Sequence, residues 1–353
     1  MHTKIVSIII PCYNNENSLP EMINCIIRQT YNLWELVIVD DQSTDNSQCI
    51  IKEYVNKDTR IKMFVRDRQP KGSTTCRNIG FENSLGQYVI HFDADDLISD
   101  TCLEKRVAFM EANPEIDYAS FPAKMWHVDI LKVPKFTDWG KTWGIGKNNM
   151  NLLRSFLRSD YPFSVWNNIY KRDSIKNLYW DENVKIYTDF SFIIPGIITR
   201  LRHRFSGLLE IDYFYRIYNN ANNMCSSFVS EEKHESTKYL IDKTLQILRG
   251  TENFNKYKQD FLYFIRLHYV RLLLSRDDVK INNFINFCSH YYSKFTITQL
   301  HILKFIVLMI KNQVLCQSIL NLICIVWFVN KRYINILKIN LQSKYRYIRK
   351  KKL

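Results

Sequence analysis

Residues 4–11 read KIVSIIIP and carry the strongest structural signal in the chain. The run is apolar at nearly every position and ends at Pro11. A strand with one face in water alternates between apolar and polar side chains, whereas a strand buried on both faces of a parallel sheet does not. We therefore predict that residues 4–10 form a central strand of a parallel sheet.

Three further apolar runs follow at spacings typical of alternating strands and helices. They cover residues 36–39, 61–65 and 88–92. Apolar side chains recur at helical spacing after Ser18, and Ser18 with Glu21 has the spacing of a capping box. Strands joined by helices make right-handed crossovers and bind ligands beyond the carboxyl ends of the strands. The predicted class is α/β, with a mostly parallel sheet flanked by helices.

Three of these strands end in side chains suited to a nucleotide or a cation. These are Pro11 and Tyr13, then Asp40 and Asp41, then Asp93, Asp95 and Asp96. Carboxylates two positions apart in an extended segment point to one side and share a hard divalent cation, Mn²⁺ or Mg²⁺. Taken singly, Tyr13 fits a packed aromatic residue, Asp41 a turn, and Asp95 and Asp96 fit helix caps. The convergence of three strand ends favours a ligand site.

The order and spacing of these motifs resemble those of family 2 glycosyltransferases with a GT-A fold. The resemblance covers residues 4 to about 220 and rests on SIIIPCYN at 7–14, VDDQSTD at 39–45 and FDADD at 92–96. It implies a Rossmann-like sheet and inverting transfer of a sugar from a nucleoside-diphosphate donor, most commonly UDP. The resemblance assigns nucleobase contacts to Tyr13 and Asp41. It assigns the cation to the acidic motif.

Two further segments carry candidate residues by the same resemblance. KGSTTCRNIG at 71–80 resembles the family's glycine-containing loop and helix. Lys71 and Arg77 are therefore candidates to bind the base or the phosphate of the donor through their positive charges. A solvated loop lysine and a structural ion pair explain them equally. YTDFSF at 187–192 stands where the family has a Glu-Asp pair, which makes Asp189 the candidate general base. Thr188 replaces the Glu, and a helix N-cap is the alternative role of Asp189.

Length and composition set the domain organisation. The chain has 353 residues, and we expect a GT-A catalytic domain at 1–230, with a donor half to about residue 100 and an acceptor half beyond it. A helical region at 231–353 follows. Nine scattered cysteines without a CxxC pair argue against disulfides and zinc and indicate a reducing cytoplasm. The histidines lack metal-ligand spacing, and His91 fits a core position.

The C-terminal region raises the question of a membrane. Residues 302–329 are strongly apolar, but Gln313, Gln317 and Asn321 recur on one helical face. One interpretation is a helix in the membrane interface with a basic tail drawn to anionic lipid; the other is a core helix and a solvated tail. The first would make the protein peripheral at the inner face of the cell membrane, where a lipid-linked acceptor in surface polysaccharide or capsule biosynthesis is reached.

The net charge of +14 leaves other functions to weigh. Nine of the positive charges follow residue 330, so the charge does not indicate a nucleic-acid surface over the predicted domain. A metal-dependent nucleotidyltransferase and a non-catalytic basic protein that binds membrane or nucleotide remain alternatives. The first would show a Gly-rich basic loop near the first strand, which residues 11–18 lack. A glycosidase needs no nucleotide site and ranks below both.

Overall fold

A computed structural model of the protein describes residues 4–127, 143–146, 148–217, 230–275, 277–294, 296–298 and 300–301. The chain divides into two compact units, Met1–Glu252 and Asn253–Leu353. Helix α8 (Glu231–Arg249) belongs to the first unit, so the division falls one helix after the boundary that we expected at residue 230.

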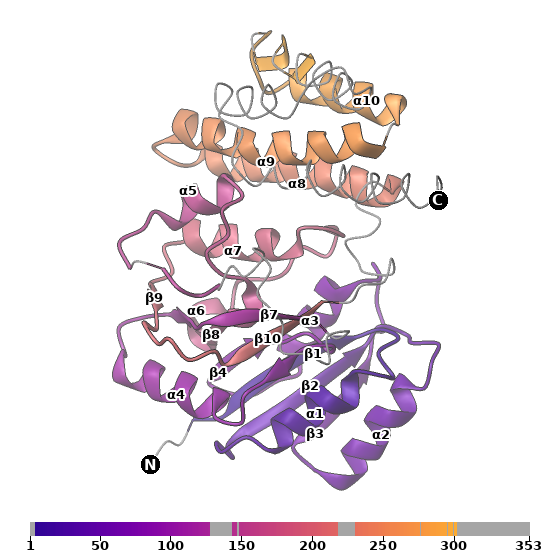
Figure 1. The fold of residues 1–353 in the computed structure, drawn as a ribbon, viewed down its shortest axis with the longest axis vertical. Coiled ribbons are helices and arrows are strands. Elements are labelled where there is room, and N and C mark those ends of the chain that lie inside the picture. The colour runs from indigo at the N-terminus through magenta and orange to yellow at the C-terminus, as the bar shows by residue number, and fades with distance from the viewer. Residues whose placement is uncertain are drawn as a thin grey trace, which may run out of the picture. The chain divides into compact units, whose positions relative to one another are not determined.

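A seven-stranded sheet runs through the first unit (Figure 1). Its order is β3-β2-β1-β4-β8-β6-β9. The strands are β1 (Val6–Cys12), β2 (Trp34–Asp40), β3 (Ile61–Val65), β4 (Tyr88–His91), β6 (Tyr118–Ser120), β8 (Asn168–Lys171) and β9 (His203–Phe205). β3, β2, β1 and β4 are mutually parallel, whereas β8 is antiparallel to both of its neighbours. The predicted mostly parallel α/β sheet is confirmed.

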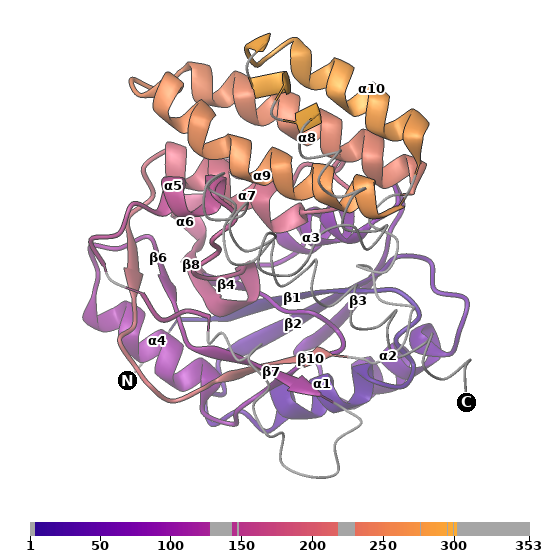
Figure 2. The same ribbon diagram turned by 45° about the horizontal axis from the view of Figure 1, so that its top comes forward.

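The apolar runs form strands because they can be buried on both faces. Every residue of β2 is buried, and Ile8, Ile9 and Ile10 in β1 have no exposed surface. Helix α3 (Ser73–Glu82) packs on one face of β1 and β2, and α1 (Leu19–Ile27) lies on the other (Figure 2). A Cβ at Gly80 of α3 would come within 2.4 Å of the Ile9 side chain, so glycine permits this close packing.

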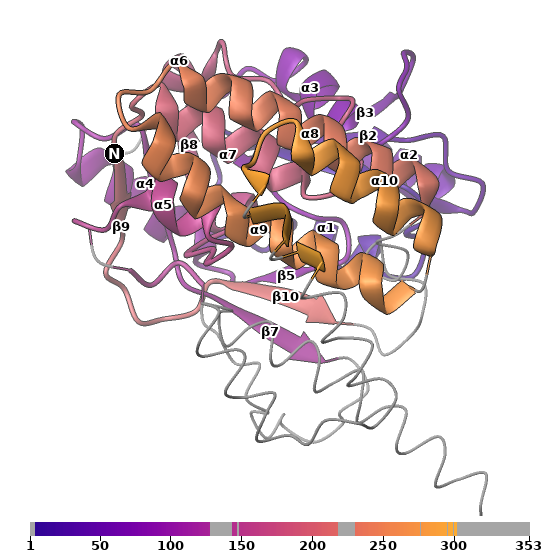
Figure 3. The ribbon, with the colours of Figure 1, turned by 90° about the horizontal axis from the view of Figure 1, so that it is seen from above.

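A second, three-stranded sheet and the remaining helices complete the first unit. The small sheet has the order β5-β10-β7, with β5 (Leu97–Ile98), β10 (Tyr213–Ile217) and β7 (Ala123–His127) (Figure 3). The helices are α2 (Ser47–Lys57), α4 (Cys102–Ala112), α5 (Leu152–Leu157), α6 (Arg172–Ile175), α7 (Thr188–Ile198) and the 3₁₀ helix η1 (Val165–Asn167).

The capping box predicted for α1 is wrong in its contacts. The helix begins directly after Ser18, as expected, but the Ser18 side chain makes no capping hydrogen bond. The Glu21 carboxylate instead pairs at 2.5 Å with the guanidinium of Arg216 in β10. The Glu21 carboxylate pairs with the guanidinium in preference to a backbone N–H, because hydrogen bonds between ionised groups are stronger.

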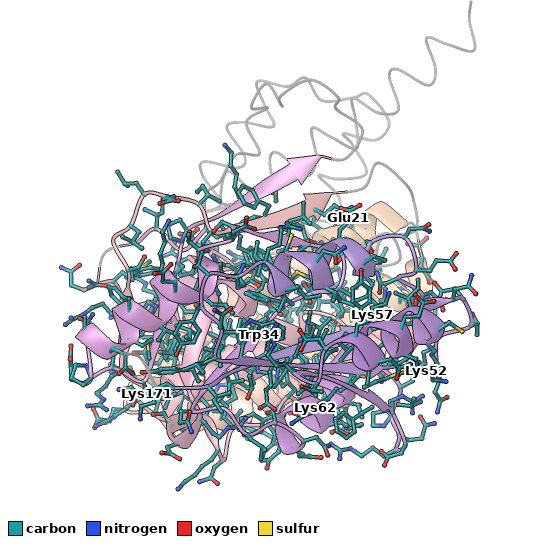
Figure 4. The ribbon with its side chains drawn as sticks, turned by 90° about the horizontal axis from the view of Figure 1, so that it is seen from below. Glu21, Trp34, Lys52, Lys57, Lys62 and Lys171 are labelled. Atoms are coloured by element: carbon teal, nitrogen blue, oxygen red, sulfur yellow. The ribbon has the colours of Figure 1, made fainter. Side chains whose placement is uncertain are left out.

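Figure 4 labels Glu21, and it also labels Trp34 and Lys62 near the starts of β2 and β3.

The second unit contains α9 (Phe254–Ser275) and α10 (Asp278–Ser289) among its described residues. The ring of Phe284 lies against His268 and Tyr269, with centroid distances of 5.1 and 6.2 Å. None of the described helices combines the length and the apolar character that crossing a bilayer requires. The segment 302–329 and the basic tail lie outside the described residues, so the structure does not test their interpretation.

Candidate active site

The ends of three adjacent parallel strands place the predicted motifs beside one another. Tyr13 follows β1, Asp41 follows β2 and Asp93 lies two residues after β4. The loops after β1 and β2 are joined by hydrogen bonds: the Asn14 backbone N–H donates to Ser43 Oγ at 3.0 Å, and Thr44 N–H donates to Asn14 Oδ1 at 2.8 Å. The topology therefore delivers the convergence that the strand pattern predicted.

Left-handed backbone conformations flank the predicted site residues. Asn14, Gln42 and Tyr187 have φ angles of 52°, 61° and 58° and directly adjoin Tyr13, Asp41 and the first turn of α7, respectively. Residues other than glycine pay for this conformation, and such strain gathers where the chain must present a side chain for function. Ser159 and Arg200 share this conformation elsewhere in the chain, so these turns accompany the strand-end geometry and do not define the site by themselves.

An aromatic ring and two lysines lie at the end of β1. Tyr13 is 44% exposed, and the Lys71 Nζ lies 3.5 Å from the centroid of its ring. The Lys185 Nζ donates a hydrogen bond to the Lys71 carbonyl oxygen, and burial lowers the pKa of Lys185. Among the described residues, neither lysine has a carboxylate within ion-pair distance. The Lys71 ammonium beside an exposed ring suits an anionic ligand that carries an aromatic group, and Lys185 adds a second positive charge at the Lys71 backbone.

Asp41 lies deeper than a surface ligand-binding residue would. It is 5% exposed and forms an ion pair with the guanidinium of Arg66, which is 3% exposed. The sequence interpretation missed Arg66. The signal was present, because Arg66 directly follows β3 and thus stands at the carboxyl end of the next parallel strand. The pair presents a carboxylate and a guanidinium together at the strand ends.

Arg77 in α3 connects the acidic motif to an aromatic residue. Its guanidinium pairs with Asp93 at 2.5 Å and lies 4.7 Å from the centroid of the Trp180 ring. Asn78 holds that tryptophan: its Nδ2 donates to the Trp180 carbonyl oxygen, and its Oδ1 accepts from the Trp180 backbone N–H, both at 2.9 Å. Arg77 is therefore the ion-pair partner of Asp93 and also contacts the Trp180 ring.

Asp93 and Asp95 are the two carboxylates that the sequence assigned to a divalent cation, and the Asp93 carboxylate is paired with Arg77. Burial, and after it the charge of Asp93, raises the pKa of Asp95 to about 6. A cation beside Asp95 would favour its ionised form. Within the described part of the chain, no group of three or more His, Cys, Asp or Glu side chains is placed to hold a metal. The pair would therefore need diphosphate oxygens and water as further ligands, which Mg²⁺ ordinarily uses.

Asp96 does not belong with the ligand-facing residues where we expected it. It has no exposed surface; one carboxylate oxygen accepts from the Tyr213 hydroxyl and the other from the Arg216 backbone N–H at 2.7 Å. Both oxygens thus serve to hold β10. The helix-cap alternative fails as well, because α4 begins after Thr101. The chain turns at Ala94 and Asp95, which leaves Asp95 partly exposed and places Asp96 in the interior.

Asp189 lies in the first turn of α7, and its carboxylate is not used as a helix cap. The cap position belongs to Tyr187, which makes no side-chain capping bond. The Asp189 Oδ2 accepts from the Ser164 hydroxyl and from the Val165 N–H at 3.4 Å. Burial raises the pKa of Asp189, while Ser164 and Arg77 hold it down and the Asp93 charge adds to the rise. Asp189 is therefore within electrostatic reach of the acidic motif.

Two remaining predictions concern residues of the strands themselves. Pro11 lies inside β1, where it pairs with Val39 of β2 and remains partly exposed. His91 is 1% exposed and packs edge-on against the stacked rings of Trp180 and Phe192, and burial lowers its pKa well below the ordinary value. The prediction that His91 is a core residue is confirmed.

Comparison with known proteins gives a consistent result. Residues 7–179 match the model of the family described as "Glycosyl transferase family 2". An uncharacterized glycosyltransferase of Haemophilus influenzae is 31% identical over 201 residues, which are 55% of this chain and 72% of that protein. The minor teichoic acid biosynthesis protein GgaB of Bacillus subtilis is 26% identical over 283 residues. That match covers 77% of this chain but 29% of the relative's length.

A solved structure shares the fold. The structure of residues 1–349 of TarS from S. aureus, in complex with UDP-GlcNAc, superposes with a TM-score of 0.60 at 22% identity. The superposition covers 80% of this chain and 79% of that one. The likeness supports a GT-A arrangement of the sheet and its helices.

Proposed function

Because this chain belongs to glycosyl transferase family 2, we propose that it transfers a sugar from a UDP donor to a hydroxyl of a glycan or lipid-linked saccharide, with inversion. Family membership makes the chain a glycosyltransferase. It leaves three hypotheses without support: a nucleotidyltransferase, a glycosidase and a non-catalytic basic binding protein. The observation that carries the proposal is the gathering of an exposed ring, a carboxylate pair and two lysines at the ends of β1, β2 and β4, where neither lysine forms an ion pair with another described residue.

The donor would bind along this row of residues. A nucleobase stacks on Tyr13, and the Asp41 carboxylate accepts from a base N–H. A base that stacks on Tyr13 would displace the Lys71 ammonium from the ring toward the diphosphate. Lys185 would add a second positive charge there. Asp93 and Asp95 would hold a divalent cation, Mn²⁺ or Mg²⁺, which neutralises charge on a departing diphosphate.

Transfer itself requires one bond to form as another breaks. The acceptor oxygen attacks the anomeric carbon, and the carbon–oxygen bond to the β-phosphate breaks with its electron pair leaving on the nucleoside diphosphate. The hydroxyl proton passes to the Asp189 carboxylate. The rise of the Asp189 pKa by burial supports this role, because a base whose pKa lies nearer the working pH accepts a proton more readily.

The acceptor is proposed from the relatives' chemistry. The B. subtilis relative is named for minor teichoic acid biosynthesis, and a growing surface polysaccharide offers the hydroxyl groups that such a transfer needs. We therefore place this protein in surface polysaccharide biosynthesis.

The first test is thermal stabilisation by UDP, GDP, dTDP and CMP, each with and without Mn²⁺. We expect UDP with Mn²⁺ at about a hundred times its Kd to raise Tm by about 5–10 °C, because a ligand that binds only the folded state stabilises it. Asp95→Asn should lose the part of the shift that depends on Mn²⁺. The matched control is Asp100→Asn, an exposed aspartate paired with Arg28. A folded wild type that no nucleotide stabilises would contradict the proposal.

Replacement of Tyr13 should weaken nucleotide binding. Tyr13→Ala removes the stacking surface, worth about 1–3 kcal/mol for one base, so the Kd for UDP should rise about 5- to 150-fold. Tyr13→Phe keeps the ring and should bind as the wild type does. Isothermal titration with UDP and Mn²⁺ measures both variants. Equal affinity of Tyr13→Ala and the wild type would place the base elsewhere.

A further inference from the structure

The two oxygens of the Asp189 carboxylate have unequal surroundings. Oδ2 accepts from the Ser164 hydroxyl and from the Val165 backbone N–H, both at the start of η1. No hydrogen bond reaches Oδ1 from any residue that the structure describes. One oxygen is therefore anchored, and the other remains available to a ligand.

Ser164 is itself held in place by a buried side chain. The Ser164 backbone N–H donates to Asn167 Oδ1 at 2.9 Å, and Asn167 has no exposed surface. Asn167 Nδ2 donates to the Phe121 carbonyl oxygen at 2.6 Å, and the Phe121 N–H donates back to the Asn167 carbonyl at 3.0 Å. This reciprocal pairing ties η1 to the chain after β6, so the Ser164 hydroxyl is presented from a rigid turn.

Charged and titratable groups face Asp189 from several elements. Arg77 of α3 and Asp93 after β4 act on its carboxylate with opposite sign. Burial raises the pKa of Tyr170 in β8, and the charge of Asp189 adds to that rise. Among the groups that hold down the pKa of Asp189, Ser164 contributes most. The hydroxyl favours the ionised form because it donates to a carboxylate oxygen.

We propose that Ser164 is the positioning residue of the general base, fixing the Asp189 carboxylate so that Oδ1 faces the acceptor hydroxyl. This inference rests on the proposed function of Asp189. Ser164 does not touch the reacting atoms. It acts by restricting the Asp189 rotamer and by favouring the carboxylate that must be present before a proton is accepted.

The test compares Ser164→Ala with Ser164→Thr, which keeps a hydroxyl. Ser174→Ala is the matched control, because the Ser174 hydroxyl donates to Asp117 at 2.8 Å in another serine–aspartate bond outside the site. Release of UDP from UDP-GlcNAc, UDP-glucose and UDP-galactose with Mn²⁺, with water as the acceptor, gives kcat and KM against pH. Carbon-13 NMR of protein labelled at the aspartate carboxyl carbons, with Asp189→Asn for assignment, gives the Asp189 pKa without any turnover.

Loss of the hydroxyl should raise the Asp189 pKa and move the acidic limb of the kcat profile to higher pH. We expect a shift of about one to two pH units, because a hydrogen bond to a charged group is lost. On the plateau above both pKa values, kcat should fall about tenfold through lost orientation, with KM for the donor unchanged. Ser164→Thr should restore the wild-type limb, and Ser174→Ala should leave it in place.

The outcomes separate this inference from the function on which it rests. If Asp189→Asn is inactive but Ser164→Ala keeps the wild-type pH limb and Asp189 titration, Ser164 is only structural and the inference falls alone. If Asp189→Asn turns over donor as fast as the wild type, the base assignment falls as well. Should Ser164→Ala not fold, Ser164→Cys, a weak donor of similar size, must show an intermediate shift, and an unshifted titration overturns the proposal.

Discussion

Replacement of Asp189 by Asn is expected to slow glycosyl transfer by about 10²- to 10⁴-fold while nucleotide binding is retained. The amide keeps the shape of the side chain, and its Oδ1 can still accept from Ser164, so α7 should remain in place. What is lost is the ability to take the acceptor proton. Thr188 beside it offers no carboxylate in compensation.

Steady-state transfer with the donor identified by thermal shift, together with titration of UDP, measures this effect. Asp100→Asn serves as the control, because Asp100 is an exposed aspartate in a surface ion pair. A variant with wild-type kcat would show that another group accepts the proton. A variant that loses UDP affinity instead would make Asp189 part of the donor site.

Replacement of Arg106 by Met should lower the free energy of unfolding by about 3–5 kcal/mol. Arg106 has no exposed surface, and its guanidinium donates to both carboxylate oxygens of Asp212 at 2.7 and 2.9 Å. It also donates to the Trp166 and Asn168 carbonyl oxygens. Methionine fills part of the volume but leaves the Asp212 charge and two carbonyls unpaired in the interior. Such a loss is a large share of the 5–15 kcal/mol typical of a folded domain.

Urea denaturation followed by circular dichroism measures this change, and two variants bracket it. Arg106→Met combined with Asp212→Asn removes the unpaired charge and should recover part of the loss. Arg28→Ala breaks the exposed pair with Asp100, whose side chains are 55% and 57% exposed, and should change stability by less than about 1 kcal/mol. Equal stability of Arg106→Met and the wild type would mean that the buried pair contributes nothing net.

The strand pattern was sufficient for the donor half of the fold. Residues 4–10, 36–39, 61–65 and 88–92 correspond to β1 to β4 with boundaries that differ by at most two residues, because buried parallel strands need long apolar runs. The same runs predicted that Tyr13, Asp41 and Asp95 would converge, since the carboxyl ends of parallel strands share one edge. The same rule places Arg66 at this edge, because Arg66 directly follows β3. Its ion pair with Asp41 was not predicted.

The other half of the sheet shows no such pattern. β6, β8 and β9 contain three or four residues each, too few for a periodicity, and they pair with strands distant in sequence. The sequence pattern therefore could not predict the order of these strands in the sheet. Asp189 was found only because its segment resembles a family motif, and Ser164 had no local signal at all.

The decisive difference lies in how far apart the interacting residues are. Period and spacing within one segment predicted the strands, the helices and the positions of Asp93 and Asp95. The contacts of Asp96 with Tyr213, of Glu21 with Arg216 and of Ser164 with Asp189 join residues 25 or more positions apart. Such pairings depend on which elements the folded core brings together, because a side chain bonds to the best partner within reach and not to the nearest in sequence.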